Sequence, residues 1–214
     1  EEDFPLKKLY EAVDRFCARH PRFGIPNLML YISLGAGLVY LFTQFSGNYM
    51  LYNILCFDRE LILQGQVWRL ITFPLTYMPS DPFSMLISLY CYYSIGRAVE
   101  ASWGTLRFNL FYFTGVVLMD IYCMILGCYA DVYYLNMSLF LAFATMFPDA
   151  QFMLFFIIPV KAWIFALLDL VLTLVEVIQL TAAGLFPYNL FPLIAIANYF
   201  LFFGKDVVNV VPLT

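Results

Sequence analysis

Ser138 is the residue in this chain whose type and position suit a catalytic nucleophile. It lies in the stretch YYLNMSLFLAFATMFPD, which carries no charge before its final residue, Asp149. Serine becomes an effective nucleophile when a neighbouring base takes its proton, and histidine is the usual base. The chain has a single histidine, His20, which precedes every long apolar segment. Ser138 is therefore either a nucleophile with an unusual base or a residue that serves helix packing.

Three acidic residues, Asp120, Asp169 and Glu176, also lie within apolar segments. An ionised group at bilayer depth costs at least about 2.5–3.5 kcal/mol on insertion scales, so it is kept when it is paired, hydrated or functional. Asp169 and Glu176 are seven residues apart and share one face of a helix. Three interpretations stay open: a hydrated path for protons or cations, hydrogen bonds to polar partners inside the protein, or a position nearer the membrane interface. An aspartyl protease pair of Asp120 and Asp169 is a weaker alternative, because the expected flanking motifs are missing.

The composition places the chain among helical membrane proteins. Hydrophobic residues make up 63% of the 214 residues and charged residues 12%, about half the charged share of a soluble domain. The apolar runs are continuous rather than alternating, which argues against a β-barrel. The five cysteines show no C-x-x-C spacing, so neither a disulfide framework nor a metal site is indicated, and no cofactor is expected. No basic run exceeds Lys7-Lys8, and we expect no nucleic-acid partner.

The apolar runs predict an all-α fold, a bundle of six membrane-spanning helices in one domain. Residues 1–26 have the pattern of an amphipathic juxtamembrane helix, 27–204 form the membrane domain, and 205–214 form a short C-terminal tail. The connection 46–81 is too polar to span the membrane and apolar enough to lie in its interface. The expected spans are 27–45, 82–100, 107–129, 133–147, 162–179 and 185–204.

The basic residues predict the orientation of these spans. With six spans and the N-terminus inside, nine of the eleven lysines and arginines fall on the inner side. Only Arg59 and Arg69 fall on the outer side. This distribution follows the positive-inside rule and supports both the number of spans and their direction.

Several motifs in the same order resemble the rhomboid superfamily. Trp68 and Arg69 lie in GQVWRLITFPL, within the long first connection. Gly96, Glu100 and Gly104 form a G-x-x-x-E-x-x-x-G pattern at the end of the second span, in IGRAVEASWGTLRFNLFYFTGVV. The stretch FPDAQFMLFFIIPVKAWIFALLDL is similar to the segment between the fourth and fifth spans of rhomboids and Derlins. The resemblance covers about residues 60–205 and implies a six-helix bundle whose first loop dips into the membrane.

The resemblance does not extend to the protease chemistry. Rhomboid proteases carry a serine in G-x-S-G at the start of the fourth span, a histidine in the sixth, and a histidine and an asparagine in the second. In this chain the two second-span positions are Ser84 and Ser88, and the sixth span has no histidine. No G-x-S-G occurs, and the nucleophile position falls at Tyr133 or Tyr134, about one turn before Ser138. We expect the Ser138 hydroxyl to bond a backbone carbonyl one turn back.

The other motif residues have structural and functional interpretations. Arg97 and Glu100 are three residues apart and suited to pairing along a helix, although Glu100 more readily braces a neighbouring loop. Trp68 and Arg69 either contact clients or lipids, or anchor the loop with Arg69 bonded to backbone carbonyls. Small residues let helices approach closely. The glycines expected to do so are Gly96, Gly104, Gly115 and Gly127.

A polar edge at the start of the fourth span suggests a small cavity on the outer side. Tyr133, Tyr134 and Asn136 form this edge, and Ser84 and Ser88 of the second span are expected to face it. The alternative is that these tyrosines are ordinary interfacial aromatics.

These observations favour a catalytically inactive, rhomboid-like membrane protein, similar to rhomboid pseudoproteases and Derlins. The resemblance implies that membrane lipids and transmembrane segments of client proteins are its partners, and that it thins the bilayer locally. The alternatives are an intramembrane serine protease with an atypical site at Ser138, and a small transporter or channel that uses the intramembrane acids. The expected location is the bacterial inner membrane, with the endoplasmic reticulum as the alternative.

A fluorophosphonate probe, which reacts with activated serines, distinguishes the first two interpretations. We expect no labelling of the chain above that of its Ser138→Ala variant, because Ser138 has no histidine to accept its proton. In-gel detection of the probe measures this. Labelling that disappears in Ser138→Ala would show an active serine and contradict the inactive interpretation.

Overall fold

The computed structural model describes residues 15–17, 19–20, 23–154 and 158–210, without the side chains of 152–159 and 204–210. Most of the predicted N-terminal amphipathic helix, and residues 211–214 of the predicted tail, lie outside this description. The described residues are mainly helical, as the sequence predicts. The long helices are α2 (Leu28–Ser46), α6 (Pro82–Trp103), α7 (Thr105–Leu126), α8 (Val132–Met146), α9 (Ala162–Ala182) and α10 (Phe191–Val210).

Three of these helices, α2, α7 and α9, are long and apolar enough to cross a membrane. Helix α8 and the stretch Tyr188–Phe203, which includes the first part of α10, are shorter apolar helices, and α6 has 22 residues but is less apolar. Helix α10 begins at Phe191 rather than at residue 185, because residues 185–190 form a turn and a short 3-10 helix, η2 (Tyr188–Leu190). It also continues to Val210, into the predicted tail.

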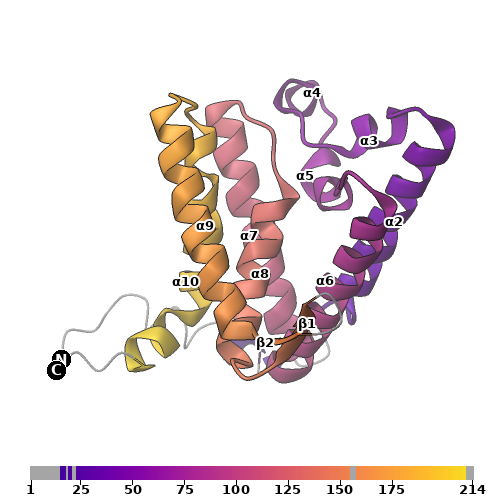
Figure 1. The fold of residues 1–214 in the computed structure, drawn as a ribbon. Coiled ribbons are helices and arrows are strands. Elements are labelled where there is room, and N and C mark those ends of the chain that lie inside the picture. The colour runs from indigo at the N-terminus through magenta and orange to yellow at the C-terminus, as the bar shows by residue number, and fades with distance from the viewer. Residues whose placement is uncertain (1–14, 18, 21–22, 155–157, 211–214) are drawn as a thin grey trace.

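Figure 1 shows α7, α8, α9 and α10 side by side, with α2 and α6 as a second group that leans away towards the upper end of the view. Helix α8 joins the two groups, since it packs against α6 as well as against α7, α9 and α10. Eleven of its fifteen residues are buried. The core of the protein is therefore centred on α8.

The first connection folds into short helices at the upper end of Figure 1: α3 (Met50–Leu55), α4 (Arg59–Leu63), α5 (Arg69–Thr72) and the 3-10 turn η1 (Phe73–Leu75). Arg69 holds this unit together. Its buried Nη1 donates to the carbonyl oxygens of Asn53 and Cys56, at 2.7 Å each, and its Nε donates to Gln66 Oε1. The Trp68 indole N–H donates to the Ile54 carbonyl at 3.2 Å. Of the two interpretations of Arg69, the bonding to backbone carbonyls is observed, at the end of α3.

The α8–α9 connection contains an antiparallel pair of strands that the all-α prediction missed. Strands β1 (Gln151–Leu154) and β2 (Ile158–Lys161) pair with Gln151 opposite Lys161. Beside the pair, the Ala162 N–H donates to the Ala150 carbonyl at 2.7 Å, and Lys161 Nζ lies 2.7 Å from Asp149 Oδ1. Apolar, β-branched residues in a segment too short for a spanning helix favour such pairing.

Glu100, in the last turn of α6, joins three parts of the chain. Its Oε1 accepts hydrogen bonds from the Asn27 N–H, at 3.0 Å, and from the Thr105 hydroxyl, at 2.9 Å. Arg97 Nη1 donates instead to the Tyr93 hydroxyl, one turn back along α6. Glu100 therefore braces the start of α2 against the α6–α7 turn, as predicted.

The motif glycines have different roles. A Cβ at Gly96 would lie 2.2 Å from Met29 Cγ, so this glycine permits the close approach of α6 to α2. A Cβ at Gly104 would meet no atom within 4 Å, and its φ of +86° shows that the α6–α7 turn needs glycine for its backbone. The prediction of close helix packing is therefore confirmed at Gly96 and wrong at Gly104.

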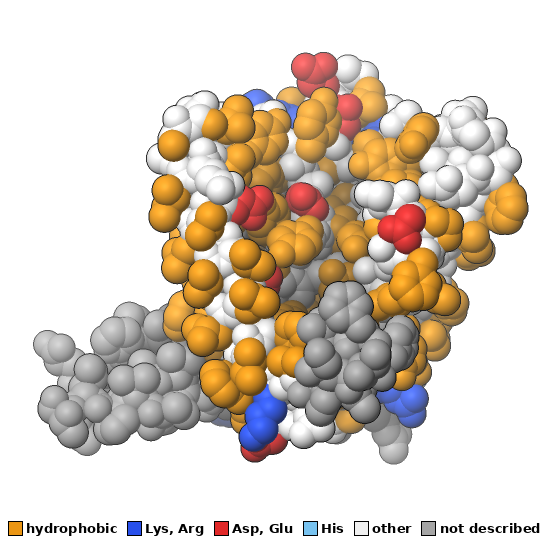
Figure 2. Space-filling model, viewed as in Figure 1, with side chains coloured by type: hydrophobic (Ala, Val, Ile, Leu, Met, Phe, Trp, Pro, Cys, Tyr) orange, Lys and Arg blue, Asp and Glu red, His pale blue; other side chains and the backbone are white. Residues whose placement is uncertain are grey.

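Helix α9 is attached to the bundle on one side only. Ala162 and Thr173 are its buried residues, whereas apolar side chains around the rest of the helix, such as Leu172 and Ile178, are exposed. Hydrophobic side chains also cover much of the face that Figure 2 shows. An apolar surface of this extent fits a protein that lies in a membrane.

Candidate functional site

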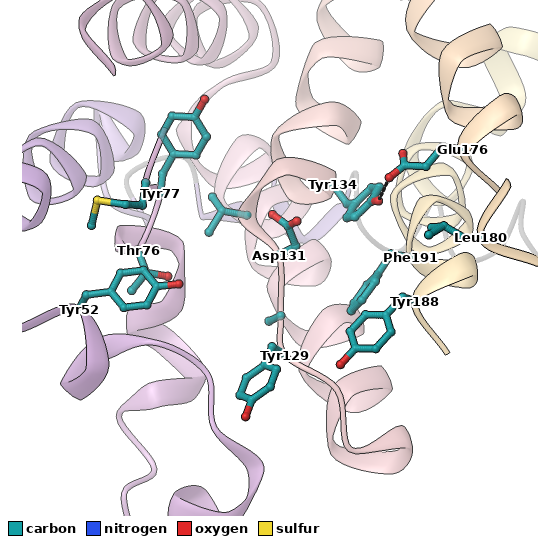
Figure 3. A pocket seen from close by; sticks show the side chains of 13 residues that line it. Tyr52, Thr76, Tyr77, Tyr129, Asp131, Tyr134, Glu176, Leu180, Tyr188 and Phe191 are labelled. Carbon is teal, nitrogen blue, oxygen red and sulfur yellow. Dashed lines mark hydrogen bonds between the residues drawn. The ribbon is translucent and has the colours of Figure 1, made fainter. Parts of the chain in front are cut away.

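A cavity of about 500 Å³ lies at the upper end of the bundle, where the two groups of helices diverge. The first connection contributes Thr76 and Tyr77 to its wall, and the turn before α8 contributes Asp131. The end of α9, η2 and the start of α10 form the opposite wall, with Glu176 and Tyr188. Figure 3 shows aromatic rings on both sides of the cavity, with the Asp131 carboxyl group between them.

A hydrogen bond between α8 and α9 forms part of the cavity wall. The Tyr134 hydroxyl donates to Glu176 Oε1 at 2.8 Å, and Figure 3 shows this bond beside the ring of Phe191. The rings of Tyr134 and Phe191 are stacked, with their centroids 5.5 Å apart. The Tyr134 side chain is buried, so its hydroxyl needs a partner, and the Glu176 carboxylate supplies one.

Asp131 caps the first turn of α8 at the mouth of the cavity. Its Oδ1 accepts a hydrogen bond from the Tyr133 N–H at 2.8 Å, an N-cap that defines where α8 begins. Burial raises the pKa of Asp131 above its ordinary value, while the Tyr133 N–H lowers it and the negative charge of Glu176 raises it further. Two acidic groups therefore interact across one cavity.

The second α9 acid has a similar partner. The Tyr133 hydroxyl donates to Asp169 Oδ1 at 3.2 Å, so Asp169 and Glu176 bond to adjacent tyrosines of α8. This confirms the predicted hydrogen bonding for these two acids. Asp120 is different: it is buried on α7, and its Oδ1 has no hydrogen-bond partner among the described residues. Neither Tyr133 nor Asp120 is among the described residues that line the cavity.

The other residues predicted to face one outer cavity lie elsewhere. Ser84 and Asp81 bond to each other at the start of α6, where Asp81 caps the helix. Ser88 bonds to the Tyr77 hydroxyl at 3.1 Å, so it touches a cavity residue without lining the cavity itself. Asn136 is buried and lines a smaller cleft between α2, α6 and α8, and its Oδ1 has no partner among the described residues.

Ser138 lies on the packed seam between α8 and α10. Its hydroxyl donates to the Leu135 carbonyl at 2.8 Å, as predicted, and accepts from Asn198 Nδ2 at 3.2 Å. A Cβ at Gly115 would lie 2.8 Å from Asn198 Nδ2, so this glycine makes room for the contact. An amide N–H donates a hydrogen bond and cannot accept the serine proton. His20 bonds instead to the Phe16 carbonyl in the N-terminal segment.

The described residues contain no group of three histidine, cysteine or acidic side chains arranged to hold a metal ion.

Comparison of the chain with protein-family models, with curated proteins and with solved structures finds no match. The likeness to rhomboids therefore rests on the sequence motifs alone.

Sequence reasoning missed much of the cavity wall. Tyr52, Tyr77, Tyr129 and Tyr188 lie near the ends of apolar segments, where tyrosine is common in membrane proteins whatever its role. Asn198 was also missed as the partner of Ser138. The available signal was an asparagine inside an apolar run, which usually has a polar partner on another helix.

A double-mutant cycle on Tyr134→Phe and Glu176→Met tests whether the hydrogen bond between Tyr134 and Glu176 holds α9 against α8. Interhelical hydrogen bonds in membrane proteins contribute about 0.6 kcal/mol on average and up to about 1.7 kcal/mol. We expect a coupling free energy in that range, measured by reversible unfolding in detergent micelles.

The matched control is the cycle of Tyr129→Phe with Glu176→Met. Tyr129 lines the same cavity and is exposed. We expect its coupling to Glu176 to be zero within about 0.5 kcal/mol. Equal coupling in the two cycles would contradict a specific role for Tyr134.

Proposed function

We propose that this chain is a rhomboid-like, catalytically inactive membrane protein that binds membrane-spanning segments of other proteins. The observation that carries the proposal is the packing of α9 against the rest of the protein. This helix is attached through one face, exposes apolar side chains on the others, and borders an open cavity lined by acids and tyrosines. A second apolar helix placed there would cover exposed apolar surface and reach polar groups with one end.

The proposed membrane topology has six spans. Helices α6, α8 and α10 would cross the membrane with α2, α7 and α9. The course of the chain supports this, since successive long helices run in opposite directions in Figure 1. Arg97 lies near the end of α6, Arg107 near the start of α7 and Lys161 just before α9, so all three belong to the lower end of the bundle. That end would face the positively charged, inner side.

The surroundings of Ser138 support the part of the proposal that the protein has no protease activity. Its hydroxyl is engaged with a carbonyl and an amide group, and its side chain is about 1% exposed. A peptide bond of a substrate must reach within about 3.5 Å of the nucleophile. A residue enclosed in this way contributes to the packing of α8 against α10.

Among the described residues, three side-chain hydrogen bonds join α9 to α8, and each involves a polar side chain of α9. They are the bonds of Asp169 and Glu176 to tyrosines and a 3.6 Å contact between Thr173 Oγ1 and Met137 Sδ. These α9 residues follow one another at spacings of four and three, which defines a single polar face. The edge of that face, next to the cavity, is where we place the bound segment.

Photocrosslinking from α9 tests this placement. A photoreactive residue at Leu172, four positions before Glu176 and 57% exposed, should crosslink to an apolar single-span peptide of about 20 residues in liposomes. A photoreactive residue at Ile178, which is 67% exposed and lies about 160° around α9 from Glu176, is the matched control. We expect a clear excess of crosslinked product at Leu172, measured by mass spectrometry. Equal yields at both positions would mean that the peptide contacts α9 only as lipid does.

The proposal includes local thinning of the bilayer next to α6. The uncharged part of this helix runs from Pro82 to Gly96, where Arg97 follows, and its exposed face carries Phe83, Leu86 and Tyr90. These 15 residues span about 22 Å, whereas the hydrocarbon core is about 30 Å thick. Lipids beside a short apolar stretch compress to match it.

The thickness of the bilayer beside α6 in lipid nanodiscs, measured by cryo-electron microscopy, tests this part. We expect a decrease of up to about 8 Å relative to the disc edge, from the difference between these lengths. In Arg97→Leu the uncharged stretch extends to Val99, and the decrease should shrink. A bilayer of even thickness around the unmodified protein would rule out thinning.

A further inference from the structure

The charges of the cavity are all of one sign. Asp131 and Glu176 are the ionisable acids among its described lining residues, and no lysine, arginine or histidine is among them. Each carboxyl group accepts one hydrogen bond within the described structure, through a single oxygen. A carboxylate has about four acceptor positions, so both groups keep acceptor capacity for a ligand. The cavity therefore has an excess of negative charge and of acceptors.

Aromatic rings surround these acids. Tyr52 and Tyr77 lie on one side and Tyr188 on the other, with Tyr129 between them, as Figure 3 shows. The faces of tyrosine rings attract cations, and the attraction grows when the cation leaves water. Carboxylates together with tyrosine rings form a chemically consistent receptor for an organic cation. At about 500 Å³ the cavity lies within the usual size range of ligand sites.

We infer that this cavity receives the lysine or arginine side chain of a membrane segment that binds beside α9. The inference rests on the proposed function and specifies which segments are preferred. Glu176 and Leu180 belong both to α9 and to the cavity wall, so a segment along the α9 edge reaches the cavity with one end. A basic residue in a membrane segment is unfavourable in the bilayer core. The acids of the cavity, at the end of the bundle, offer its charge a partner.

A lipid headgroup fits the same cavity less well. Phosphatidylcholine also carries a cationic group, but a phosphate accompanies it. The described lining offers no basic side chain for that phosphate, and the two carboxylates would repel it. A basic side chain brings positive charge alone, so the charge balance favours a protein segment.

Binding of two synthetic peptides to the full chain in phosphatidylcholine nanodiscs tests the inference. Both peptides are apolar spans of about 20 residues. Each carries either lysine or glutamine one turn from the end that would lie beside the cavity. We expect the lysine peptide to bind about tenfold more tightly by fluorescence energy transfer, which corresponds to about 1.4 kcal/mol. This comparison uses the unmodified protein, so it does not depend on whether any variant folds.

The variant Asp131→Asn/Glu176→Gln should abolish the preference. Asparagine retains the helix cap and glutamine retains an acceptor for Tyr134, so the charges are lost while the hydrogen bonds are kept. Glu60→Gln is the matched control, because Glu60 is exposed on α4 at the same end of the bundle and does not line the cavity. It should leave the preference unchanged.

The outcomes separate this inference from the proposed function. If both peptides bind equally well, segment binding stands and recognition of a basic residue is wrong. If neither peptide binds, both proposals fail. If spin-labelled phosphatidylcholine is immobilised without peptide, and the double variant releases it, the cavity holds a lipid headgroup and the inference is overturned.

Discussion

A polar group in an apolar environment must find its partner within the protein, and this constraint organises the molecule. Arg69 satisfies carbonyls that end α3, and Glu100 satisfies the N–H group of Asn27 before α2. Tyr134 and Glu176 satisfy each other across α8 and α9. Each contact joins parts of the chain that are at least 13 residues apart in sequence. The positions of the helices thus follow from polar pairs as much as from apolar packing.

Local features of the sequence predicted the helices well. Continuous apolar runs identified the long helices, and the Asp131 cap and Gly127 turn lie close to the predicted boundaries. The start of α10 was misplaced because apolar residues continue through the turn before it, and the strand pair was missed because its composition resembles that of an apolar helix.

The cavity was predicted only at Tyr134. Its other walls come from the first connection, α9 and η2, and a single sequence does not show how such distant segments meet.

Ser138 shows how a hydroxyl in a suggestive place can be held by contacts between helices. The partner that reaches it from α10 is Asn198, sixty residues later, and an amide holds the hydroxyl in position without accepting its proton. Gly115 on α7 provides the space for this contact. Three helices therefore meet at this serine. In the proposed rhomboid-like arrangement, the nucleophile position falls about one turn before this serine, at Tyr133 or Tyr134, and the Tyr134 hydroxyl donates to Glu176.

Helix α9 is held by different kinds of bond at its start and along its length. At its start, the ladder of β1 and β2 and the Ala162–Ala150 backbone bond fix the chain direction. Along its length, side-chain contacts from Asp169, Thr173 and Glu176 provide the attachment. Helix α9 is therefore fixed by backbone bonds at its start and by side-chain bonds along one face. With 21 residues it is about 30 Å long, so a tilt of about 5° at its start moves its far end, at the cavity, by about 2–3 Å.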